Sequence, residues 1–138
     1  MAQSVLGESI VCLINRLQPA SPWDRITQKE FLTGAEILKV VETVYRIKPR
    51  EPIMAAVYDG DLVTHAIALE GLDASGRMLY HDGNLGRSLL CAENNAAGVA
   101  AEPGPDSLWL ISREEMEVVI FAVLLDSNDW LQACGIKE

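Results

Sequence analysis

The sequence predicts an α+β fold, with N-terminal helices in the first half packed on an antiparallel β-sheet in the second. Apolar residues recur at helical spacing before residue 50, and short apolar runs typical of strands follow Pro52. Turns rich in Gly, Asp and Ser separate these runs. The 138 residues (1–138) have the length of a single domain, which can bury a core without disulfides or metals.

Two helices are predicted in the first half. The first runs from Ser4 to Leu17, where most apolar residues follow helical spacing, and Pro19 ends it. The second runs from about Ala35 to Arg46 and is opened by a capping box at Thr33-Gly-Ala-Glu36, in which a hydroxyl and a carboxylate bind the free amides of a helix start. The same pattern at Thr27-Gln-Lys-Glu30 predicts only a short helical turn.

Strands dominate the prediction from residue 52 onward. A short buried strand is expected at Pro52–Tyr58. A hairpin is expected from Thr64–Leu72 and Arg77–His81, because Asp73-Ala-Ser-Gly76 is a good turn between them. Asn94–Pro105 is rich in Ala, Gly and Pro and predicts a loop.

The C-terminal part predicts a short helix, a closing strand and a tail. Ser112 starts the helix, which continues through Met116, and the apolar run Val118–Leu125 predicts the strand. Asp126-Ser-Asn-Asp129 predicts a turn into a short tail.

Composition excludes several classes of partner and site. The 20 acidic and 11 basic residues give a net charge of −9, which disfavours nucleic acid and anionic membranes, since both need a basic surface. No apolar run is long enough to span a membrane, and Met1–Ser4 has no basic region of a secretory signal, so we expect a cytoplasmic protein. Three cysteines without CxxC spacing and two histidines disfavour a disulfide framework and a zinc site, and we expect no metal or cofactor.

The predicted hairpin carries a candidate catalytic pair. If Leu72 faces Arg77 across the turn, His65 lies opposite Asn84, and Asp82 lies diagonal to His65 on the same face. A carboxylate or amide beside an imidazole fixes its tautomer, as in the base-and-orienter half of a nucleophilic triad. The alternative is a surface histidine that meets a carboxylate near a turn by coincidence. A register shifted by one residue would move Asp82 to the other face.

Three segments together resemble a known family: Pro52-Ile-Met-Ala-Ala-Val57, Thr64-His-Ala-Ile-Ala-Leu-Glu-Gly-Leu-Asp73 and Gly76-Arg-Met-Leu-Tyr-His-Asp82. They resemble the back half of papain-like cysteine peptidases and are most similar to the bacterial branch that contains the double-glycine leader peptidases. The resemblance implies a papain-like fold in which His65 is the base and Asp82 orients it.

The family's nucleophile is a cysteine at the N-terminus of the first long helix, where free amides and the helix dipole stabilise a thiolate. Here Ile14-Asn15-Arg16-Leu17 resembles the end of that helix, which places the nucleophile position at Ser4. Gln3 directly precedes it, whereas the family's oxyanion-hole glutamine lies several residues further upstream. Cys12, flanked by Val11 and Leu13, is expected to be a small core residue.

Three explanations of Ser4 stay open. A natural cysteine was replaced by serine to trap an inactive form, or the serine is natural and the protein is an inactive relative. In the third, the alignment is shifted and Cys12 is the nucleophile.

The resemblance implies a cysteine-peptidase-type hydrolase or acyl transferase acting on a peptide or amide bond. Its substrate would be a protein or peptide, and the family's habits fit a bacterial effector secreted without a classical signal peptide. The alternative is a catalytically inactive papain-like binding module that recognises a protein partner, which a natural serine at position 4 favours.

Overall fold

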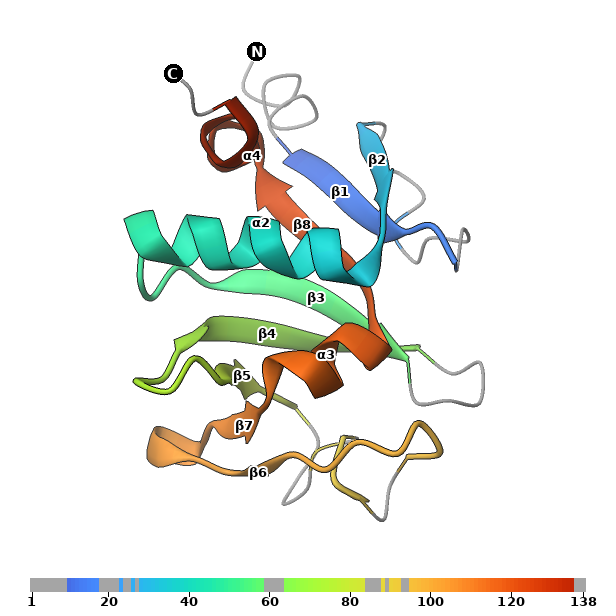
Figure 1. Ribbon diagram of the computed structural model, residues 1–138, viewed down its shortest axis with the longest axis vertical. Coiled ribbons are helices and arrows are strands. Elements are labelled where there is room, and N and C mark those ends of the chain that lie inside the picture. Colours follow the sequence, from blue (N-terminus) through green and yellow to red (C-terminus); the bar gives the residue numbers. More distant parts are fainter. Residues whose placement is uncertain are drawn as a thin grey trace.

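The computed structural model describes residues 10–17, 23, 26, 28–58, 64–83, 88, 90–92 and 95–135, and within these it is a mixed α+β fold. The described elements, in chain order, are β1 (Ile10–Asn15), β2 (Lys29–Leu32), α2 (Gly34–Ile47), β3 (Ile53–Tyr58), β4 (Thr64–Leu72), β5 (Met78–His81), β6 (Glu102–Pro103), η2 (Pro105–Ser107), β7 (Trp109–Ile111), α3 (Arg113–Val119), β8 (Ile120–Asp126) and α4 (Ser127–Gly135). The strands form one sheet in the order β2-β1-β8-β3-β4-β5-β7-β6. Helices α2, α3 and α4 lie over the same face of this sheet (Figure 1).

The sheet is mixed rather than antiparallel. Its first two strands in the chain, β1 and β2, run parallel to each other, while the other described pairs are antiparallel. β8, near the end of the chain, pairs with both β1 and β3 and so joins the N-terminal strands to the central hairpin. The predicted α+β class is therefore confirmed, while the prediction of a purely antiparallel sheet is wrong.

The helix predicted over Ser4–Leu17 is wrong in the described part of that range, because residues 10–15 form strand β1. Both faces of β1 are apolar and buried, so apolar residues occur at almost every position of the segment. Their spacing therefore could not distinguish a strand from a helix. The β-branched Ile10, Val11 and Ile14 suit a pleated, buried strand. The turn predicted at Thr27–Glu30 is also wrong for its described residues, since Lys29 and Glu30 begin β2.

The second predicted helix is confirmed as α2. Thr33 is its N-cap: the Thr33 hydroxyl accepts a hydrogen bond from the Glu36 amide at 3.0 Å, and the Glu36 carboxylate accepts one from the Thr33 amide at 2.9 Å. These reciprocal bonds satisfy amides that a helix start leaves free. The inner face of α2 is buried against the sheet through Ile37, Leu38 and Val41.

The strand predicted at Val118–Leu125 is confirmed in outline as β8, after a short helix, α3, capped by Ser112 as expected. The predicted C-terminal tail is wrong, because α4 occupies Ser127–Gly135. Asp126 accepts a hydrogen bond from the Asn128 amide at 2.8 Å at the start of this helix, so its carboxylate acts as a cap rather than as a turn residue. Asp129 is buried in α4 and pairs with Lys48 Nζ at 2.9 Å, which ties α4 to the end of α2.

The predicted hairpin is confirmed as β4 and β5, but its register at the turn differs. Leu72 faces Met78 rather than Arg77, because the turn takes up one additional residue. A bulge between Leu69 and Gly71 then restores the register, so that Leu69 faces Tyr80. Gly71 has a φ of +124° there, and a Cβ atom at this position would lie 2.6 Å from the carbonyl oxygen of Pro49. Only glycine fits this bulge without strain.

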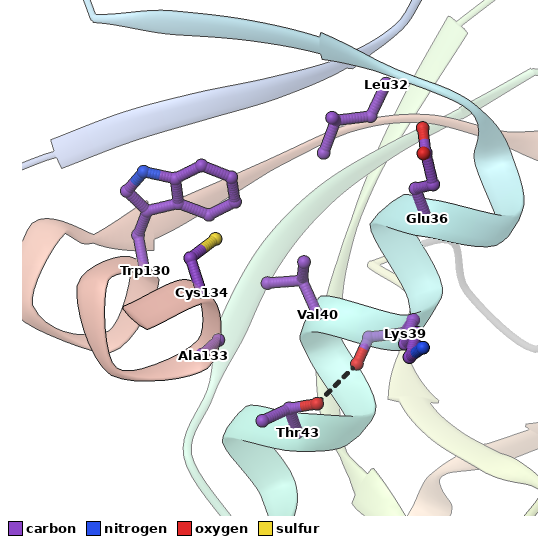
Figure 2. A pocket seen from close by; sticks show the side chains of 8 residues that line it. All are labelled: Leu32, Glu36, Lys39, Val40, Thr43, Trp130, Ala133 and Cys134. Carbon is purple, nitrogen blue, oxygen red and sulfur yellow. Dashed lines mark hydrogen bonds between the residues drawn. The ribbon is translucent and has the colours of Figure 1, made fainter. Parts of the chain in front are cut away.

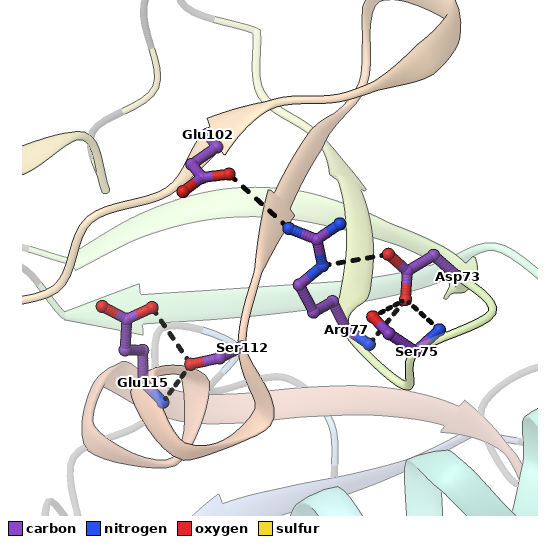
Figure 3. A network of polar contacts seen from close by, with 6 residues as sticks. All are labelled: Asp73, Ser75, Arg77, Glu102, Ser112 and Glu115. Atoms are coloured by element: carbon purple, nitrogen blue, oxygen red, sulfur yellow. Dashed lines mark hydrogen bonds and ion pairs between the residues drawn. The ribbon is translucent and has the colours of Figure 1, made fainter.

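The turn of the hairpin is held by Asp73 (Figure 3). Its carboxylate accepts hydrogen bonds from Ser75 and from both the backbone and the guanidinium of Arg77, at 2.8–3.0 Å. Arg77 also pairs with Glu102 on β6 at 3.5 Å, which connects the turn to the edge strand. These contacts stabilise the end of the hairpin that is distant from His65.

Apolar side chains pack on both faces of the sheet. The larger core lies between the sheet and the three helices. A smaller cluster on the other face contains Cys12, Ile14 and Ala122, with Trp23 and Ile26 packed against it. Within the described residues, no helix combines the length and apolarity needed to cross a membrane.

Candidate functional site

His65 and Asp82 are in direct contact, as the hairpin argument predicted. His65 lies near the start of β4, and Asp82 follows the last residue of β5. The Nε2 atom of His65 lies 2.7 Å from Oδ1 of Asp82. The His65 side chain is 24% exposed, whereas the Asp82 side chain is fully buried. The imidazole therefore faces both a buried carboxylate and the surface.

The register of the hairpin produces this contact. Leu69 faces Tyr80 and Ala68 faces His81, so the same pairing continued by one residue places Asp82 opposite Ile67 and diagonal to His65. This is the relation that the sequence predicted from a different turn register. The additional turn residue and the Gly71 bulge compensate for each other, and for this reason the predicted face of Asp82 is correct.

A third side chain, which the sequence reasoning missed, binds the other oxygen of Asp82. The Ser88 hydroxyl donates to Asp82 Oδ2 at 3.0 Å and lies 2.5 Å from the Tyr80 hydroxyl. The Leu90 amide donates to the same Ser88 oxygen at 3.1 Å. Tyr80 shares the face of Asp82 two residues earlier, so strand alternation could have pointed to it, whereas no spacing rule points to Ser88.

This arrangement defines which ring nitrogen of His65 is available for chemistry. An ionised carboxylate only accepts hydrogen bonds, so Nε2 donates to Asp82 and carries the proton in the neutral ring. Nδ1 then has the lone pair, and it makes no hydrogen bond within the described part of the chain. A partly buried imidazole with one nitrogen held and the other open is the geometry of a general base.

The predicted nucleophiles do not lie beside this pair in the described structure. Cys12 is fully buried, as expected for a core residue, but it lies on a strand and packs in the cluster on the sheet face opposite the helices. Ile67, which alternation places on the same face as His65, packs in the core beneath the helices. Cys12 is therefore separated from His65 by the sheet, and the third explanation of Ser4 is not supported. Ser4, Gln3 and Asn84 lie outside the described residues.

The second histidine is a natural control for the first. His81 lies on β5 opposite Ala68, on the other face of the sheet from Ile67, and is exposed. Among the described residues, no group of three or more His, Cys, Asp or Glu side chains is arranged to hold a metal ion.

A separate pocket of about 300 Å³ lies between α2 and α4, at the β2 end of the sheet (Figure 2). Its wall is largely apolar, with Leu32, Val40 and Trp130, and Cys134 lies at its edge. Burial raises the pKa of the Cys134 thiol, and the charge of Glu30 raises it further. A thiol that is less ionised than usual is a weaker nucleophile, so the exposed Cys134 should react more slowly than free cysteine.

No protein-family model matches the chain, and no curated protein matches it in sequence.

Proposed function

We propose that the chain is a papain-like, cysteine-peptidase-type enzyme that transfers or hydrolyses an acyl group at a peptide or amide bond. The observation that carries the proposal is the 2.7 Å contact between partly exposed His65 and buried Asp82. In this proposal His65 is the general base, Asp82 orients it, and the side chain at position 4 is the nucleophile.

In the proposed reaction, the Nδ1 lone pair of His65 accepts and returns protons. Nδ1 of His65 takes the proton of the nucleophile, whose oxygen or sulfur then bonds to the carbonyl carbon of the substrate. As the C–N bond breaks, the imidazolium returns that proton to the leaving amine. Water attacks the resulting ester or thioester by the same proton transfers and releases the acid. Asp82 stabilises the imidazolium that forms in each half of the reaction.

One observation favours the second candidate function, a non-catalytic binding module. Ile10 pairs with Asp126 at one end of β8, whereas His65 pairs with Val57, which faces Ile120 at the other end. At about 3.3 Å per residue and about 4.8 Å per strand, Ile10 lies roughly 24 Å from His65. Six residues span at most about 21 Å. This distance is unfavourable for a nucleophile six residues before Ile10, and it therefore favours the binding module.

The experiment that decides between the two functions is alkylation of a thiol at position 4. In a Cys134→Ser background, Ser4→Cys is treated with iodoacetamide at pH 6, and labelling of each cysteine is followed by peptide mass spectrometry. We expect position 4 to react about tenfold faster than free cysteine, since an adjacent imidazolium increases the thiolate fraction. His65→Ala should remove the excess rate, and the matched variant His81→Ala should retain it. If position 4 reacts no faster than free cysteine, or if His65→Ala leaves its rate unchanged, the proposed enzymatic function is rejected. The non-catalytic binding module is then the remaining candidate function.

A further inference from the structure

We propose that Ser88 is a positioning residue that, with Tyr80 behind it, holds Asp82 in the orientation that keeps the proton of neutral His65 on Nε2. Its consequence for rate rests on the function proposed above, whereas its effect on the histidine ring does not. The proposal stands on four contacts among Tyr80, Ser88, Asp82 and His65 and the amide of Leu90.

The direction of each hydrogen bond follows from the number of protons. A serine hydroxyl has one proton, and Ser88 gives it to Asp82 Oδ2. The Ser88 oxygen accepts from the Leu90 amide, and it can only accept from Tyr80 as well. The protons therefore run from Tyr80 to Ser88 and from Ser88 to Asp82, and Asp82 accepts from His65 on its other oxygen.

Burial stabilises this order. Ser88 and Tyr80 are completely buried, so water does not replace a missing partner at either hydroxyl. Burial raises the pKa of Tyr80, against the Ser88 hydrogen bond that lowers it, and the charge of Asp82 raises it further. Tyr80 thus stays protonated and remains a donor to Ser88.

The loop that carries Ser88 is anchored to the core. The Cys91 amide donates to the Ser88 carbonyl at 3.1 Å, and the Ala101 amide donates to the carbonyl of fully buried Leu90 at 2.9 Å. Asn95 donates to the carbonyl oxygens of Cys91 and Val99 at 2.8 and 3.0 Å. The position of the Ser88 hydroxyl is therefore set by the fold, as a residue that orients a carboxylate requires.

The test records nitrogen NMR of the two histidine rings in the full chain at alkaline pH. We expect His65 to show a protonated Nε2 and an unprotonated Nδ1, while exposed His81 shows the average of exchanging tautomers and serves as the internal control. Ser88→Ala should move the His65 nitrogen shifts toward the pattern of His81, and Ser88→Thr, which keeps the hydroxyl, should retain the wild-type pattern. Tyr80→Phe should produce a smaller change in the same direction.

An unchanged His65 spectrum in folded Ser88→Ala overturns the proposal. If Ser88→Ala does not fold, Tyr80→Phe decides, and an unchanged His65 spectrum there overturns it equally. In the Ser4→Cys background, Ser88→Ala should also slow alkylation by about threefold, a part of the roughly tenfold excess that the adjacent imidazolium supplies. If Ser4→Cys reacts no faster than free cysteine while the NMR changes appear, the proposed function fails and the role of Ser88 stands.

Discussion

Replacing Gly71 by alanine should destabilise the protein strongly, because the bulge at this position sets the register of the site. The φ of +124° is strained for any residue with a Cβ atom, at a cost of about 1–3 kcal/mol. The new Cβ would also lie 2.6 Å from the Pro49 carbonyl oxygen, and relieving such an overlap costs about 1–3 kcal/mol more. We expect the free energy of unfolding to fall by about 3 kcal/mol, out of the roughly 5–15 kcal/mol of an ordinary domain.

Two other glycines separate these contributions. Gly76 has a φ of +91°, but a Cβ atom added there would meet no atom of the described part of the chain within 4 Å, so Gly76→Ala should cost only about 1 kcal/mol. Gly83 has no positive φ, and a Cβ atom added there would meet no atom of the described residues within 4 Å, so Gly83→Ala should cost nothing measurable. The assay is equilibrium unfolding in urea for all three variants. If Gly71→Ala is no more destabilising than Gly76→Ala, the reasoning about the bulge is refuted.

Three further predictions concern the cap, the hairpin turn and the cysteines. Thr33→Ala should lower the free energy of unfolding by about 1 kcal/mol in urea titrations, because it removes the N-cap of α2, whereas Thr43→Ala inside the same helix should not; equal losses would contradict the cap. Burial opposes ionisation of Asp73, but hydrogen bonds from Ser75 and Arg77 outweigh it and hold its pKa at about 2, below the ordinary 3.8. The stability that ionised Asp73 contributes is therefore present above pH 4 and is lost as the pH falls toward 2. The difference in urea midpoint between wild type and Asp73→Asn should shrink over that range. A difference that stays constant would count against the hydrogen bonds of the turn. Buried Cys12 should react with a disulfide reagent only when the protein unfolds, whereas exposed Cys134 should react in the native state. The reaction is measured by the thiolate that the reagent releases. Rapid labelling of Cys12 in the native protein would contradict its burial.

The sequence predicted best those elements whose signal is local. The bounds of β4, Thr64–Leu72, were predicted correctly because polar turn residues follow it. α2 was predicted correctly because its capping box lies within four consecutive residues, Thr33 to Glu36. β1 was missed because an apolar run buried on both faces has no period of its own.

The candidate site shows the same limit. The pairing of His65 with Asp82 was predicted from strand alternation, although the assumed turn register was wrong by one residue. The bulge that corrects it depends on the close approach of Gly71 to Pro49, which is a tertiary contact. Ser88 comes from a loop and was not found, since loop residues follow no periodic rule.

Formation of an acyl-enzyme shows whether His65 acts as the base in acyl transfer. The Ser4→Cys, Cys134→Ser chain is mixed with p-nitrophenyl acetate, and nitrophenol release and the site of acetylation are followed together. We expect a burst of about one nitrophenol per chain, an acetyl group at position 4, and slow turnover that His65→Ala abolishes and His81→Ala preserves. Absence of a burst, or acetylation at position 4 that does not depend on His65, would contradict it.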